Sequence, residues 1–262
     1  MNVELFSSVA PAPEPRGTVL LAHGFGEHRG RYKDFVAALN AAGYDTWSFD
    51  FTGHGTSGGK RARVDVRQLI GEHLQIRRDV LQRSRTHRLF LFGHSMGGLI
   101  TLASTLLDPT HIEAVAVTGP ALRPLPTMNV KFASAVTPLA KVAPWIDTIG
   151  LDTSLLSRDP QVEADYLADP LVYTGKVPLL TGATMLTQGD QVIRNAGMLS
   201  RPVLILHGQD DGLADFRGSL EFADRAGALV DVEVIPEAYH ELLNEPAKDV
   251  YAHRIVDWFD RW

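Results

Sequence analysis

The chain contains no cysteine among its 262 residues. It therefore has no disulfide bonds, no thiol nucleophile and no cysteine-bound metal. It also lacks any run of about 18 consecutive apolar residues, which a membrane-spanning helix would need. The opening segment, MNVELFSSVAPAPEPRG, has neither a basic start nor an uninterrupted apolar stretch. We therefore expect no signal peptide and a cytoplasmic protein.

An excess of positive charge is also missing, since the net charge is −6. A general nucleic-acid-binding surface is therefore not expected. Hydrophobic residues make up 45% of the chain and charged residues 21%, which is typical of a globular protein with a sizeable core. The length is sufficient for one large α/β domain, or for a domain that carries an insertion.

Six short apolar segments are typical of strands in a parallel sheet, because several of them run without alternation, as strands covered on both faces do. They are residues 18–24, 45–51, 88–93, 112–119, 202–208 and 231–238. Between and after them lie helical patterns, at residues 32–43, 66–80, 97–107 and 246–262. Strand and helix alternate, which predicts a doubly wound, mostly parallel α/β sheet.

One stretch interrupts this alternation. From residue 122 to residue 196, seven prolines occur among short helical pieces. Because a structureless loop of that length is implausible inside a compact domain, we predict an inserted helical cap over 122–196. The core would then consist of 1–121 and 197–262. The cap is expected over the carboxyl ends of the strands, where open α/β sheets bind ligands.

Residues 93–97 read Gly-His-Ser-Met-Gly and follow a predicted strand. This is the pattern G-x-S-x-G, in which a sharp strand-to-helix turn holds a serine hydroxyl exposed. Glycines flank the serine because a Cβ there would collide with neighbouring backbone. The alternative is a glycine-rich turn with an incidental serine, since the pattern is short enough to arise by chance. A base, an acid and an oxyanion hole elsewhere in the chain decide between the two.

A serine hydroxyl is a weak nucleophile, so Ser95 needs a histidine base that a carboxylate orients. In α/β hydrolases the acid and then the histidine follow the serine along the chain. The loop QDDGLAD comes after strand 202–208, and YHELLNEP comes after strand 231–238. His240 is therefore the candidate base, and Asp210, Asp211 and Asp215 are candidate acids. A surface histidine and an ordinary turn carboxylate are the alternatives, but three matches in the right order argue against coincidence.

The oxyanion hole should use the backbone N–H of Met96, directly after the serine, and a second N–H from the loop HGFGEHRGR, where Phe25 follows the first strand.

Three other motifs are set aside. GHGTSG (53–58) fits G-x-G-x-x-G but does not lead directly into a helical pattern, and HELLN (240–244) lacks the second histidine of a zinc site. GTSGGK lacks the first glycine and the final serine or threonine of a phosphate loop. We predict neither a cofactor nor a metal.

Taken together, these segments resemble the monoacylglycerol lipases and their lysophospholipase-like relatives. The shared pieces are HGFGEHRGRY, FDFTGHGTSGG, GHSMGG, SRDPQVEADYLADPLVY, HGQDDGLAD and YHELLNEP. They extend from about residue 20 to residue 246, and HG-x-GEH together with GHSMGG is much more specific than G-x-S-x-G alone. The resemblance implies an α/β-hydrolase fold with a helical cap.

The resemblance also assigns roles by position. It implies that Ser95 is the nucleophile, Asp211 the acid and His240 the base. The oxyanion N–H groups would come from Phe25 and Met96. In the predicted cap, Tyr166 of ADYLADPL matches a tyrosine that the family turns toward the glycerol moiety.

Two features depart from the family pattern. Leu242 and Leu243 follow the candidate base where family members often carry a further polar residue, which concerns head-group specificity. The N-terminal segment is also short for the usual opening hairpin. Neither departure touches the candidate nucleophile, acid or base.

We therefore expect a cofactor-free serine ester hydrolase that cleaves monoacylglycerols to fatty acid and glycerol. A lysophospholipase, a general carboxylesterase and a cofactor-free haloperoxidase are alternatives on the same scaffold, and a non-catalytic binding protein is an alternative of another kind. The expected partner is a small lipid ester, with no nucleic acid and no obligate protein partner. The apolar segment 130–151 is either a cap helix packed on the core or an exposed face for transient contact with membranes or lipid aggregates.

Overall fold

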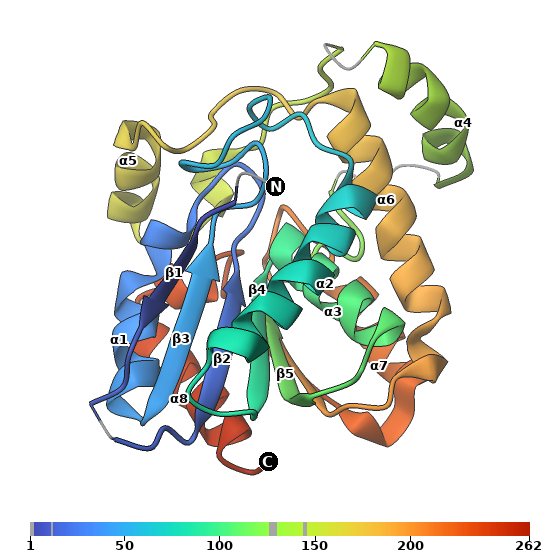
Figure 1. Ribbon diagram of the computed structural model, residues 1–262. Helices are drawn as coiled ribbons and strands as arrows, with labels where there is room; N and C mark the ends of the chain where they lie inside the picture. The colour runs from blue at the N-terminus through green and yellow to red at the C-terminus, as the bar shows by residue number, and fades with distance from the viewer. Residues whose placement is uncertain (1–2, 12, 126–129, 144–145) are drawn as a thin grey trace.

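The computed structural model describes residues 3–11, 13–125, 130–143 and 146–262. A seven-stranded sheet crosses the centre of the molecule in the order β1-β3-β2-β4-β5-β6-β7 (Figure 1). The strands are β1 (Leu5–Ser8), β2 (Gly17–Ala22), β3 (Tyr44–Phe49), β4 (Leu89–His94), β5 (Ile112–Thr118), β6 (Val203–Gly208) and β7 (Val230–Ile235). Strand β1 pairs with β3 in antiparallel fashion, whereas the other five pairings are parallel. The predicted mostly parallel α/β sheet is confirmed.

The six predicted strands are all present, with ends within three residues of the predicted ones. The sequence-based prediction misses β1, which is only four residues long and partly exposed. Its pairing of Leu5 with Phe49 extends the sheet on the edge next to β3. The short N-terminal segment therefore does contribute an antiparallel edge strand.

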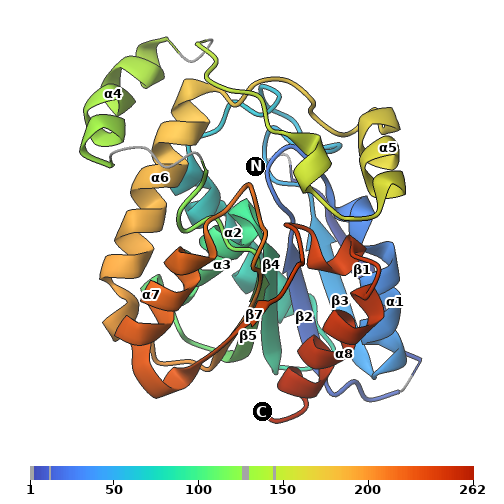
Figure 2. The same ribbon diagram turned by 180° about the vertical axis from the view of Figure 1, so that it is seen from behind.

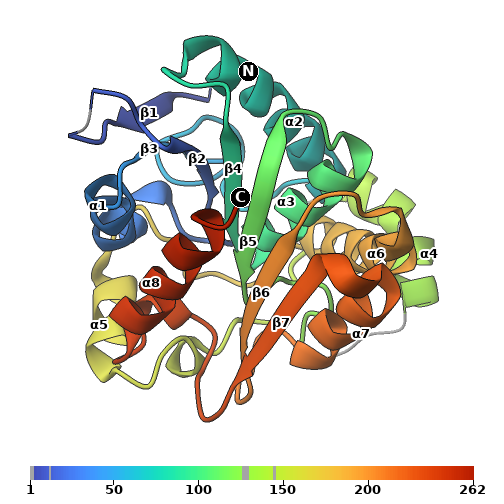
Figure 3. The same ribbon diagram turned by 90° about the horizontal axis from the view of Figure 1, so that it is seen from below.

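Alternate side chains of the central strands pack into two separate cores. On β2, Leu20 packs into one core, while Val19 and Leu21 pack into the other. The helices of the first core are α2 (Val66–Arg83), α3 (Met96–Leu107), α6 (Leu179–Arg194) and α7 (Phe216–Ala226), and those of the second are α1 (Lys33–Ala41) and α8 (Lys248–Phe259). Figure 3 shows these two layers on opposite faces of the sheet. Both faces are covered, which explains the continuous apolar runs.

The first part of the chain between β5 and β6 lies above the carboxyl ends of the strands, whereas its last helix runs down beside the sheet (Figures 1 and 2). The segment forms α4 (Val130–Val142), the short helix η2 (Thr153–Leu155), α5 (Pro160–Ala168) and α6. Residues 126–129 and 144–145 of the predicted cap lie outside the described residues. Among the described residues, no helix combines the length and apolar character needed to cross a membrane.

Helix α4 combines the two interpretations of segment 130–151. It packs against α6 and buries Ala133, Thr137 and Ala140. Phe132 and Leu139, two turns apart on the same helix, are 57% and 54% exposed. One face of α4 is therefore packed, and another presents large apolar side chains to solvent.

The strand order reverses between β2 and β4, because β3 lies on the far side of β2 and β5 on the far side of β4. Ala22, at the end of β2, pairs with Gly93 near the end of β4. The loops that follow these two strands therefore diverge from neighbouring points. Such a reversal opens a crevice at the carboxyl edge of an α/β sheet, which is the usual place for a ligand.

Candidate active site

Ser95 lies at the sharp turn between β4 and α3. Its backbone has φ 53° and ψ −119°, a region that residues with a Cβ rarely occupy. The turn is held by the Ser95 N–H, which donates to the Thr118 carbonyl at 3.0 Å, and by the Ser95 carbonyl, which accepts from Ala121 N at 3.0 Å. The G-x-S-x-G pattern thus forms the predicted strained strand-to-helix turn.

The glycines around Ser95 permit a close approach of backbone segments. A Cβ on Gly97 would lie 2.2 Å from the Ala22 carbonyl oxygen, and one on Gly93 would lie 2.5 Å from the Gly97 carbonyl oxygen. The start of α3 therefore packs directly on the end of β2. Phe25 follows in the loop after β2, and the Phe25 and Met96 N–H groups donate no hydrogen bond to another backbone group in the described part of the chain.

His240 and Asp211 meet beside this turn. The His240 Nδ1–H donates to Asp211 Oδ2 at 2.6 Å, and both side chains are almost completely buried. The loops that carry them are joined by the Asp210 N–H, which donates to the Ala238 carbonyl at 3.1 Å. Of the three candidate acids, Asp210 is exposed and Asp215 caps α7 by accepting from Arg217 N. The structure therefore brings His240 together with Asp211.

Burial and mutual attraction shift the pKa values of this pair in opposite directions. Burial alone would raise the pKa of Asp211, but the charge of His240 and hydrogen bonds from His207 and His240 outweigh it and lower that pKa. Burial alone would lower the pKa of His240, but the charge of Asp211 and its hydrogen bond outweigh it and raise that pKa. Asp211 is therefore ionised at neutral pH, and His240 is a stronger base than an ordinary histidine.

Three other buried histidines near the site behave differently. Burial lowers the pKa of His94 to about 4 and that of His54 to about 3, and it also lowers the pKa of His23. The ring of His94 lies beside that of His240, with 4.7 Å between ring centroids. The pKa values of these three histidines are therefore shifted in the opposite direction to that of His240.

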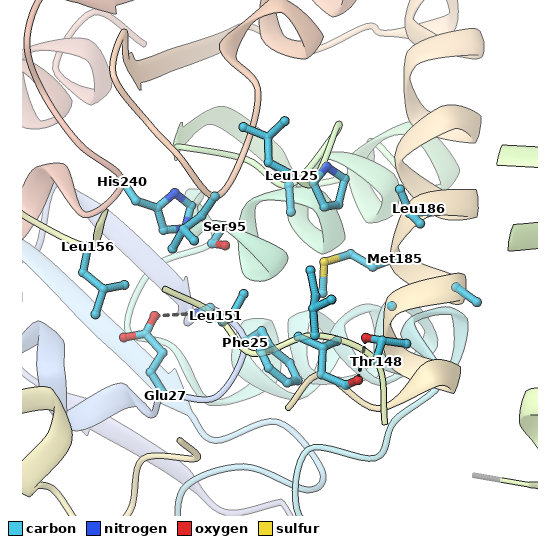
Figure 4. Close-up of a pocket in the computed structure, with 18 of the residues that line it drawn as sticks. Phe25, Glu27, Ser95, Leu125, Thr148, Leu151, Leu156, Met185, Leu186 and His240 are labelled. Carbon is cyan, nitrogen blue, oxygen red and sulfur yellow. Dashed lines mark hydrogen bonds between the residues drawn. The ribbon is translucent and has the colours of Figure 1, made fainter. Parts of the chain in front are cut away.

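Ser95 and His240 line the same cleft. Figure 4 shows the two residues at one wall, with Leu125, Leu151 and Met185 opposite or beside them. Most of the lining is apolar and comes from the segment between β5 and β6. Apolar pockets with a few polar groups are typical of small-molecule sites.

A buried ionic cluster forms the polar end of this cleft. Arg31 donates to Glu27 Oε2 at 2.9 Å and makes two bonds with Glu241, at 2.6 and 2.8 Å. Glu27 also accepts from Gly24 N at 2.6 Å and from the Tyr32 hydroxyl at 2.5 Å. Burial raises the pKa of Glu27, but attraction to Arg31 dominates and lowers it to about 2. Two carboxylates thus share one guanidinium.

Tyr166 of α5 lies against this cluster. The Arg31 guanidinium sits 4.8 Å from the centre of its ring, and the side chain lines the cleft. In the described part of the chain, the Tyr166 hydroxyl has no hydrogen-bond partner. The tyrosine that the resemblance singled out is therefore placed at the polar end of the cleft.

Sequence reasoning did not find Glu27, Arg31 or Glu241. The i, i+4 spacing of Glu27 and Arg31 within GEHRGR was visible, but their meeting with a residue 210 positions away was not. Glu241 also bears on the departure from the family pattern, in which Leu242 and Leu243 follow the candidate base in place of a further polar residue. Leu242 is buried in the core, and the polar group at this point is supplied by Glu241.

A serine on a strained strand-to-helix turn and a buried Asp–His pair after the last two strands define a serine α/β hydrolase. A family model described as serine aminopeptidase S33 matches residues 13–247. A monoacylglycerol lipase of Mycolicibacterium smegmatis is 35% identical, over 95% of this chain and 89% of its own length.

Solved structures agree. The crystal structure of the Paleococcus ferrophilus monoacylglycerol lipase has a TM-score of 0.88 at 30% identity, covering 99% of this chain and 98% of its own. A soluble variant of the Saccharomyces cerevisiae monoglyceride lipase, in complex with a substrate analog, has a TM-score of 0.86 at 26% identity, covering 99% and 91%. The chain belongs to the monoacylglycerol lipase family of α/β hydrolases and is a carboxylic ester hydrolase.

The raised pKa of His240 predicts how ester hydrolysis depends on pH. His240 must be neutral to accept a proton, so we expect ester hydrolysis to fall as the pH drops, with a midpoint above about 6.5, the ordinary pKa of histidine. The measurement is kcat/KM between pH 5 and 9, with circular dichroism at each pH as the control for folding. A flat profile from pH 5 to 8 in the folded protein would contradict a histidine base.

Proposed function

We propose that this protein hydrolyses monoacylglycerols through an acyl-enzyme formed on Ser95. The observation that carries the proposal is the 2.6 Å contact of His240 Nδ1 with Asp211 Oδ2, in a cleft that Ser95 and His240 both line. A carboxylate bound to Nδ1–H leaves Nε2 as the proton acceptor, which is the tautomer that serine activation requires.

The proposed reaction has two halves. Ser95 Oγ attacks the ester carbonyl carbon while His240 Nε2 takes the hydroxyl proton, and the N–H groups of Phe25 and Met96 stabilise the oxyanion. The alcohol leaves with the proton from His240, and the acyl group stays on Ser95. Water then attacks the acyl-enzyme by the same route, with His240 again as base and then acid. Asp211 stabilises the imidazolium in both halves.

The two ends of the cleft favour a substrate with one acyl chain and a small neutral head. We place the chain along the apolar wall contributed by residues 122–196, which we propose as the cap, and the glycerol hydroxyls beside Tyr166, Glu27 and Glu241. Two carboxylates around one guanidinium leave this end with an excess of negative charge. Such an environment disfavours a phosphate head, which argues against the lysophospholipase alternative. The names of the relatives support the same substrate.

Substitution of the proposed nucleophile and acid tests the mechanism. Ser95→Ala and Asp211→Asn should each lower kcat by on the order of 10⁴-fold, because one removes the attacking atom and the other the partner of the imidazolium. Asp210→Asn and Asp215→Asn are the matched controls, since neither carboxylate contacts His240. Initial rates on a monoacylglycerol and circular dichroism of each variant give the answer. A Ser95→Ala protein that keeps a tenth of wild-type activity would refute the proposal.

The head-group role of Tyr166 is tested by substrate selectivity. We expect wild type to prefer monoacylglycerol over di- and triacylglycerol of the same chain length, and Tyr166→Phe to weaken that preference by about 0.5–1.5 kcal/mol, the value of one neutral hydrogen bond. Tyr173→Phe is the control, because the Tyr173 hydroxyl donates to the Lys176 carbonyl instead. Equal turnover of mono- and triacylglycerol would rule out a narrow site. An unchanged Tyr166→Phe profile would remove only the head-group role.

We also infer that the exposed face of α4 contacts lipid aggregates. Phe132 and Leu139 present apolar area there, and burial of such a side chain contributes roughly 1.5–3 kcal/mol. Phe132→Glu/Leu139→Glu should therefore reduce binding to phospholipid vesicles at least tenfold while hydrolysis of a soluble short-chain ester is unchanged. Leu107→Glu, at the opposite end of α3 from Ser95 and 69% exposed, is the control. Equal vesicle binding by both variants would place lipid contact elsewhere.

A further inference from the structure

His207 is a buried imidazole that the proposed mechanism does not use. It lies near the end of β6, four residues before Asp211, and is fully inaccessible to solvent. Its Nε2 is 3.1 Å from Asp211 Oδ2 and 3.0 Å from the Ala214 carbonyl oxygen. Its Nδ1 is 2.8 Å from the Ser219 hydroxyl oxygen on α7. Both ring nitrogens therefore have partners.

The partners determine where the proton of His207 lies. A carbonyl oxygen and a carboxylate oxygen only accept hydrogen bonds, so Nε2 carries a proton and donates to both. In the neutral ring, Nδ1 then accepts from the Ser219 hydroxyl. The hydroxyl thus fixes the ring at one end while the other end donates to the carboxylate.

His207 completes the set of donors around Asp211. Oδ1 accepts from the N–H groups of Leu213 and Ala214, at 2.8 and 2.9 Å. Oδ2 accepts from His240 and from His207. Four donors for a carboxylate with about four acceptor positions leave it no freedom to rotate. Without His207, only the bond to His240 itself would hold Oδ2.

We propose that His207 is a positioning residue, which holds Asp211 Oδ2 in place for His240 and shares its negative charge. The proposal rests on the proposed function, since it concerns the same acid and base. A carboxylate that gives part of its charge to a second donor attracts the His240 imidazolium less strongly. His207 therefore restrains the basicity of His240 as well as orienting its partner.

The charged groups that act most strongly on His240 are Asp211, Glu241 and Glu27, and the neutral imidazole of His94 lies beside its ring. Asp211 in turn is influenced by His240 and His207. None of the other groups contacts Asp211 Oδ2 within hydrogen-bond distance in the described part of the chain. Asp211 Oδ2 is therefore the side-chain atom that His207 and His240 share in the described part of the chain.

Two amide substitutions of His207 test the roles of its two ring nitrogens individually. In His207→Gln the longer side chain places an N–H donor where Nε2 stood and keeps the bond to Asp211. In His207→Asn the shorter side chain reaches the position of Nδ1, keeps the contact with Ser219 and leaves Asp211 Oδ2 without its second donor. Both variants lose the imidazole and both are neutral, so each is the control for the other.

We expect His207→Asn to lower kcat by about 10- to 100-fold, the usual cost of losing such a supporting residue, with KM unchanged. The pKa of His240, measured by NMR titration of its ring protons and assigned with His240→Gln, should rise in His207→Asn. The acidic limb of the rate profile should move to higher pH with it. His207→Gln, which keeps a donor to Asp211, should stay close to wild type in kcat. Circular dichroism and thermal unfolding check that both variants fold.

Equal losses of kcat in the two variants would reduce His207 to a packing residue and overturn the proposal. So would a His207→Asn protein with wild-type kcat, or one in which the His240 pKa stays in place or falls. If His207→Asn does not fold, His207→Gln decides alone, and a tenfold loss of kcat there overturns the proposal. The NMR titration needs no ester turnover. A wild-type protein that hydrolyses no ester would refute the proposed function, whereas the His240 titration still tests His207.

Discussion

The buried carboxylate of Asp211 is the constraint on which the arrangement of this site depends. Removing an ion from water costs several kcal/mol unless donors replace the solvent. Here the donors are two backbone N–H groups of its own loop and two imidazoles, one from β6 and one from the loop after β7. The loop after β6 must therefore curl around the charge, and His240 must approach it from the neighbouring strand. The position of the His240 ring is therefore set by the need of the buried Asp211 carboxylate for hydrogen-bond donors.

A second buried charge cluster fixes the other side of the cleft. Arg31 joins Glu27, in the loop after β2, to Glu241, in the loop after β7, and lies over the ring of Tyr166 from α5. Glu27 also accepts from Gly24 N, next to Phe25. One guanidinium thus connects the loop with the proposed oxyanion donor, the loop with the proposed base and the segment above the sheet. In a chain without cysteine, paired buried charges provide the cross-links between these loops.

Much of the fold could be predicted from the sequence, because a strand that is buried on both faces is a continuous run of apolar residues. Strand β1 has no such run, since it is four residues long at an edge. Helix α7 was also missed, although it is amphipathic and begins after the capping residue Asp215. The candidate nucleophile and the candidate base were chosen from local patterns at strand ends. The choice among three neighbouring aspartates needed the family resemblance, and in the structure Asp211 is the one of the three that contacts His240.

The remaining parts of the site could not have been predicted, for one physical reason. Arg31 and Glu241 are separated by 210 residues, and a sequence pattern carries no record of such a pair. His207 is close to Asp211 in sequence, yet it stands in an apolar strand where a buried histidine has many ordinary roles. Only the contacts of both ring nitrogens, which the structure shows, distinguish His207 from an ordinary buried histidine.

The backbone of Ser95 carries a further consequence. A residue with a Cβ in the left-handed region costs the folded state about 1–2 kcal/mol relative to glycine, and the surrounding backbone contacts of the turn keep it there. Glycine at this position would relieve that strain in the folded state, at the cost of more conformational freedom in the unfolded chain. The serine therefore marks a point where the fold carries backbone strain in order to hold one hydroxyl at the wall of the cleft. At Ser95, the backbone conformation that lowers strain and the one that places the hydroxyl in the cleft are therefore not the same.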